Sequence, residues 1–142
     1  MILLEFSTAE LQLMRTLLAQ YDEIVHGEND PVLARLFPVA YRDDPDAAAE
    51  FARYTRSGLV ETKSSRAGVI AAAVASDEAA LVLSDEDAAA WLPVLTDLRL
   101  IVAERLGIVR DEDEVPDDPL GEVYHWLGQL QSYLIDALDA LT

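Results

Sequence analysis

The chain has 142 residues, and 51% of them are hydrophobic, which suits one globular domain (residues 1–142) with a single core. The absence of cysteine excludes disulfides, thiolate metal sites, cysteine nucleophiles and thiol-based redox sensing within the chain. The formal net charge of −17 repels nucleic acid and anionic membranes at long range, whereas a basic protein partner is easier to accommodate.

The first predicted helix follows STAE at residues 7–10, which has the pattern of a capping box. Apolar residues then recur at helical spacing until Gly27, which we expect to end the helix. A short second helix is predicted over NDPVLARLF, with Asp30 as its N-cap and Pro31 at its first position.

The stretch LARLFPVAYRDDPDAAAEF at residues 33–51 raises the question of a catalytic loop, a binding loop or a structural corner. Its large apolar side chains and its two prolines favour a corner that holds helices together. We expect a structural ion pair beside it, in which Arg42, Asp43 and Asp44 pair with Arg99 or with one another.

Asp44 is also the predicted N-cap of a third helix that runs towards Ala75, with a kink expected at residues 55–58. A short strand is predicted at residues 80–83, a helix at residues 85–106 ended by Gly107, and a last helix from Pro119 nearly to the end. The predicted fold class is therefore a compact, mostly α-helical bundle with a small two-stranded β ribbon.

A weak internal repeat relates residues 4–25 to residues 81–102, and each half shows a strand, a cap and an amphipathic helix. If the repeat is structural, the two strands pair into the ribbon and their helices are buried together. The alternative is that any two capped amphipathic helices look alike, and the sequence leaves both interpretations open.

Two E-x-x-H motifs, residues 23–26 and 122–125, contain the only histidines and resemble the ligand pattern of di-iron helical bundles. A helical wheel places both motifs away from the apolar faces of their helices, so we expect them to point outward. We therefore expect no metal and no cofactor, and we identify no catalytic residue, because no nucleophile motif or phosphate-binding glycine loop is present.

The only candidate basic stripe comprises Arg53, Arg56 and Lys63, which share one side of the third predicted helix. It is the predicted contact for a protein partner or for nucleic acid. The alternative is an ordinary solvated face with weak local ion pairs.

Three segments together carry a resemblance to a known family: LARLFPVAYRDDPDAAAEFARYTR, WLPVLTDLRLIVAERLGI and YHWLGQLQSYL. Their order and spacing resemble an actinobacterial family catalogued as a domain of unknown function, also called the AosR-type oxidative stress regulator family. The resemblance covers nearly the whole chain and implies a cytoplasmic transcriptional regulator of the oxidative stress response.

The sequence and the resemblance together predict a non-enzymatic, cytoplasmic and homodimeric regulator that acts mainly through protein contacts, such as those with the transcription machinery. Direct DNA contact through the basic stripe is disfavoured by the net charge. One alternative is an adaptor linked to proteolysis, because the family is often encoded near the ClpS protease adaptor. The other is a metal-binding bundle, which the wheel argument disfavours.

Overall fold

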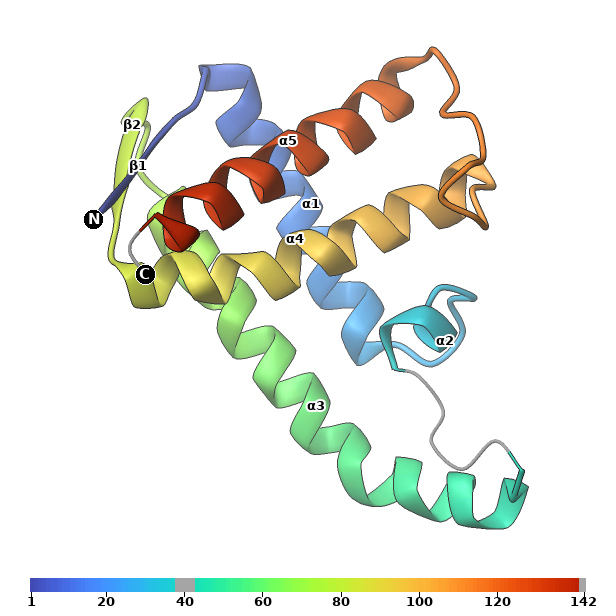
Figure 1. The fold of residues 1–142 in the computed structure, drawn as a ribbon. Helices are drawn as coiled ribbons and strands as arrows, with labels where there is room; N and C mark the ends of the chain where they lie inside the picture. Colours follow the sequence, from blue (N-terminus) through green and yellow to red (C-terminus); the bar gives the residue numbers. More distant parts are fainter. Residues whose placement is uncertain (38–42, 141–142) are drawn as a thin grey trace.

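The computed structural model describes residues 1–37 and 43–140, except for the side chains of residues 48 and 52–54. Its elements in chain order are β1 (Ile2–Glu5), α1 (Thr8–His26), α2 (Leu33–Leu36), α3 (Pro45–Ala73), β2 (Ala80–Leu83), α4 (Asp85–Leu106) and α5 (Pro119–Asp139). Figure 1 shows the small ribbon at one end of a helical body. The predicted class, mostly α with a two-stranded ribbon, is confirmed.

The internal repeat is structural. β1 and β2 pair antiparallel, with Leu4 opposite Leu81. Because the repeat offset is 81 − 4 = 77, Leu4 is both the ladder partner and the repeat equivalent of Leu81, which places a local two-fold axis at this pair. The caps obey the same offset: Ser7 accepts a hydrogen bond from the Glu10 amide, and Ser84 accepts one from the Asp87 amide.

The core is built from the inner faces of both halves of the repeat. Buried repeat-equivalent positions on α1 and α4 are Leu11, Met14, Leu17, Leu18, Tyr21 and Val25, matched by Ala88, Trp91, Val94, Leu95, Leu98 and Val102. The Phe6 ring stacks on Trp91 with ring centroids 6.2 Å apart. The Phe6 ring also packs edge to face with Trp126 of α5, with ring centroids 5.9 Å apart. These contacts fasten the ribbon to α4 and α5.

Helix α4 is central, since it packs against α5 along one side and against α3 along another. Helix α2 is shorter than predicted and begins at Leu33. The carboxylate of Asp30 accepts from the Val32 amide and also pairs with Arg105 at 2.6 Å, and residues 31–32 form a turn that leads into the helix. Helix α3 is one helix of 29 residues that ends at Ala73.

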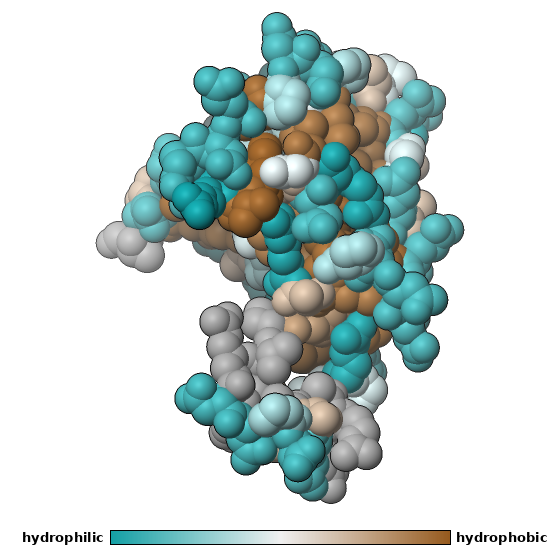
Figure 2. All heavy atoms as spheres, turned by 90° about the vertical axis from the view of Figure 1, so that its right-hand side faces the viewer, coloured by the Kyte–Doolittle hydropathy of each residue, from teal (hydrophilic) through white to brown (hydrophobic). Residues whose placement is uncertain are grey.

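The N-terminal part of α3 extends away from the other helices (Figure 1). In Figure 2, hydrophobic residues gather on the main body, whereas the described part of the protruding end is mainly hydrophilic. No helix among residues 1–37 and 43–140 has the length and apolar character needed to cross a membrane.

Candidate functional site

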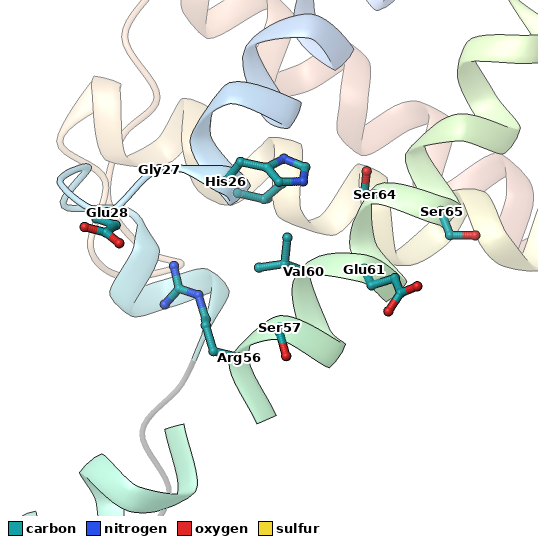
Figure 3. Close-up of a pocket in the computed structure, with 10 residues that line it drawn as sticks. His26, Gly27, Glu28, Arg56, Ser57, Val60, Glu61, Ser64 and Ser65 are labelled. Atoms are coloured by element: carbon teal, nitrogen blue, oxygen red, sulfur yellow. The ribbon is translucent and has the colours of Figure 1, made fainter. Parts of the chain in front are cut away.

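An open groove of about 800 Å³ lies between the C-terminal end of α1 and the middle of α3. Its size is in the range of small-ligand and peptide sites. Figure 3 shows side chains from both helices around Val60, with His26 on one side and Arg56 on the other. The lining residues are Val25, His26, Gly27, Glu28, Arg56, Ser57, Val60, Glu61, Ser64 and Ser65.

Next to this groove, a buried polar cluster joins three helices. The Tyr21 hydroxyl of α1 and the Lys63 ammonium of α3 each donate a 2.6 Å hydrogen bond to Oδ2 of Asp97 on α4. Asp97 is only 7% exposed and is the one buried charged residue in the described part of the chain. A buried carboxylate needs such partners, so the cluster fixes how the three helices meet.

The electrostatics of the cluster favour a structural role. Burial is the main cause that raises the pKa of Tyr21, and the neighbouring Asp97 carboxylate raises that pKa further. The phenol therefore stays protonated at neutral pH and acts as a hydrogen-bond donor. It cannot serve as a general base or a nucleophile there.

Two residues of the predicted basic stripe, Arg56 and Lys63, lie on the side of α3 that packs against the protein. Lys63 and Arg56 lie on the same side of the helix as Ala67 and Ile70, which are buried. Lys63 is therefore neutralised inside the protein by Asp97. The Arg56 guanidinium lies 3.7 Å from the centre of the Phe37 ring and lines the groove, while the Arg53 side chain lies outside the described residues.

The structure does not join Arg99 to the described acidic residues of the predicted ion pair. Arg99 faces α5, where its Nη1 donates to Gln131 at 3.2 Å, because it lies on the side of α4 that packs against that helix. Asp44 caps α3 by accepting from the Ala47 amide. Among the described residues, neither Asp43 nor Asp44 forms an ion pair with Arg99. Arg42 lies outside the described residues.

Both E-x-x-H motifs point outward, which confirms the helical-wheel prediction. The four side chains of Glu23, His26, Glu122 and His125 are exposed. His26 contacts its own helix through the Asp22 carbonyl at 2.8 Å. In the described part of the chain, no group of three or more histidine and acidic side chains is arranged to hold a metal ion.

Sequence reasoning missed Asp97 and the groove. A signal for Asp97 was present, because it lies three residues after Val94 and one before Leu98, on the apolar face of its helix. A charge at such a position indicates a buried partner. The groove had no local signal, since its walls come from elements separated by about thirty residues.

Comparison with known proteins matches residues 1–138 to the family Domain of unknown function (DUF2017). Proteins of Mycobacterium tuberculosis (strain H37Rv) and Mycobacterium bovis, both named oxidative stress regulator AosR, are 34% identical over 124 residues, which cover 75% of this chain and 57% of theirs. A relative from Mycobacterium leprae is 34% identical over 129 residues, 78% of this chain and 59% of its own.

The chain thus spans a little under three fifths of the length of these relatives. No solved structure matches it. The match over almost every residue, together with the mycobacterial relatives, shows that the chain belongs to the DUF2017 family.

Proposed function

We propose that the chain is a non-enzymatic regulator of the oxidative stress response that acts through protein contacts made by the groove between α1 and α3. The names of the mycobacterial relatives support the regulatory role. The observation that carries the mode of action is the mixed charge of the groove, which is lined by Arg56 as well as by the acidic residues Glu28 and Glu61. Such a surface suits a protein segment that carries both charged and apolar side chains.

Direct DNA binding is the weaker mode of action for three physical reasons. The net charge of −17 opposes approach to phosphates. Lys63, one of three cations in the basic stripe, is held by Asp97. The two carboxylates in the groove would repel a phosphate backbone that approached Arg56.

The hydrogen bonds of the groove also favour a binding role over catalysis. The Ser64 hydroxyl contacts the Asp22 carboxylate at 3.3 Å, and the His26 ring contacts the Asp22 carbonyl. Ser64 and His26 are thus each engaged with Asp22 and do not form a nucleophile–base pair with one another.

The experiment measures binding of the labelled full chain to purified RNA polymerase by fluorescence anisotropy. Ser57→Trp fills the groove from an exposed position of α3, and Thr62→Trp adds the same bulk on the opposite side of that helix. We expect saturable binding that Ser57→Trp weakens at least about tenfold, a loss of about 1.4 kcal/mol, and that Thr62→Trp leaves unchanged.

A second titration uses DNA from upstream of the protein's own operon at about 150 mM salt. We expect no sequence-specific binding of the chain alone. Specific DNA binding under these conditions, or polymerase binding that both tryptophan variants weaken equally, would refute protein contact through the groove.

A further inference from the structure

In the described part of the chain, no carboxylate forms an ion pair with Arg99, although the chain has a large excess of acidic residues. Four other cations, Arg15, Arg35, Lys63 and Arg105, each form an ion pair with a carboxylate. Arg99 is half-buried between α4 and α5, and its Nε atom is fully buried without a hydrogen-bond acceptor in the described part of the chain. A partly buried cation without a counter-charge is energetically unfavourable, so an anionic ligand would stabilise this position.

The guanidinium of Arg99 is held in a fixed position by neutral groups. Its Cζ lies 4.3 Å from the centre of the Tyr124 ring, and a Cβ atom at Gly128 would lie 3.3 Å from that Cζ. Gln131 donates to the Thr96 hydroxyl at 2.7 Å, which leaves its amide oxygen to accept from Arg99. These contacts orient the Arg99 guanidinium but do not neutralise its positive charge.

A shallow pocket of about 450 Å³ opens at this guanidinium. It is lined by Arg99, His125, Gly128, Gln129 and Ser132. None of these side chains is a carboxylate, and four of the five offer N–H or O–H donors. The neighbouring carboxylates of α5, Glu122 and Asp136, lie about one helical turn beyond either end of the pocket.

We infer that this pocket binds a single oxyanionic group, a carboxylate or a phosphate, with Arg99 as its charge partner and His125 and Ser132 as additional donors. The planar guanidinium matches both oxyanions through paired hydrogen bonds. A polyanion would meet the overall negative charge, whereas one small oxyanion meets only the local field of the pocket. The inference is independent of the groove between α1 and α3.

The test is an NMR titration of the full, ¹⁵N-labelled chain that follows the arginine Nε–Hε signals. Sodium acetate and inorganic phosphate are the two probes, added up to about 50 mM with ionic strength held constant by chloride. We expect a saturable shift of the Arg99 signal with a dissociation constant of about 5 mM or tighter for at least one probe. The comparison of the probes identifies the preferred oxyanion.

Arg99→Gln should weaken binding at least about tenfold, because a charge-assisted hydrogen-bonding group is lost. Arg110→Gln is the matched control, since it removes the same charge from an exposed residue and should leave the constant unchanged within about twofold. His125→Gln should weaken binding about threefold, whereas His26→Gln on α1 should not.

If Arg99→Gln does not fold, the comparison of His125→Gln with His26→Gln tests the inference instead, because both histidines are exposed and their replacement should not disturb the fold. The inference is overturned if neither probe gives a saturable shift of the Arg99 signal, or if the Arg110 signal responds equally. Equal binding by folded Arg99→Gln, or equal effects of the two histidine variants, would overturn it as well.

Discussion

Replacing Lys63 by methionine tests the buried polar cluster most directly. Methionine keeps most of the length of the lysine stem but removes the ammonium that lies 2.6 Å from Asp97. The carboxylate would then keep the Tyr21 hydroxyl as its remaining partner in the cluster, at 2.6 Å. One hydrogen bond from a neutral donor does not compensate a buried negative charge.

The burial of the pair sets the size of the expected effect. The Lys63 and Asp97 side chains are 16% and 10% exposed. Breaking a buried ion pair costs about 3–5 kcal/mol, and the residual exposure of Asp97 favours the lower end. We expect Lys63→Met to lower the free energy of unfolding by about 3 kcal/mol, equivalent to about 10 °C in Tm. Asp97→Asn should cost about 2 kcal/mol, since it keeps a partner for Tyr21 and leaves a lysine that can reach water.

Urea unfolding followed by circular dichroism at 222 nm measures these losses, and the double variant measures the coupling. The double variant should be less destabilised than the sum of the single variants by about 1–2 kcal/mol. Asp77→Asn is the control, because its ion pair with Arg15 is on the surface and Asp77 is 89% exposed. It should cost less than about 0.5 kcal/mol. A loss below about 1 kcal/mol for Lys63→Met, or additive single losses, would refute the reasoning.

Three further predictions use the same unfolding assay. Since the folded state raises the pKa of Tyr21 above its ordinary value near 10, the unfolded chain loses that proton first, and stability should fall by about 1.4 kcal/mol per pH unit above pH 10. Tyr21→Phe should reduce this slope, and an equal slope would contradict the assignment. Ser7→Ala and Ser84→Ala should each cost about 1 kcal/mol through a lost cap, and unchanged stability in both would contradict it. Gly121→Ala should cost about 2 kcal/mol or more, because its Cβ would lie 1.9 Å from the Pro116 carbonyl oxygen, and a wild-type urea midpoint would count against this contact.

The sequence predicted well the features that depend on local chemistry. Caps such as Ser7 and Ser84 are encoded within four residues, and the period of the apolar residues identifies the buried faces of α1 and α4. The internal repeat also predicted one tertiary contact, because its two equivalent strands, β1 and β2, pair in the ribbon.

Features that depend on partners distant in the sequence were predicted poorly. The predicted start of α2 was too early, and the Asp30 carboxylate that was expected only to cap it also pairs with Arg105 on α4. Lys63 was predicted as an exposed cation, whereas in the structure it pairs with the buried carboxylate of Asp97 on α4. Arg99 was expected beside the corner, whereas the side of α4 on which it lies faces α5. In each case packing against residues distant in the sequence set the environment of the side chain.

The position of Lys63 also governs the amine chemistry of the protein, because it is the only lysine in the chain. Its nitrogen is engaged with Asp97 at the junction of α1, α3 and α4. An acylating reagent should therefore reach Lys63 only when the junction opens. The same restriction applies to any enzyme that attaches a tag to lysine, so acylation of this residue would report on local opening of the fold.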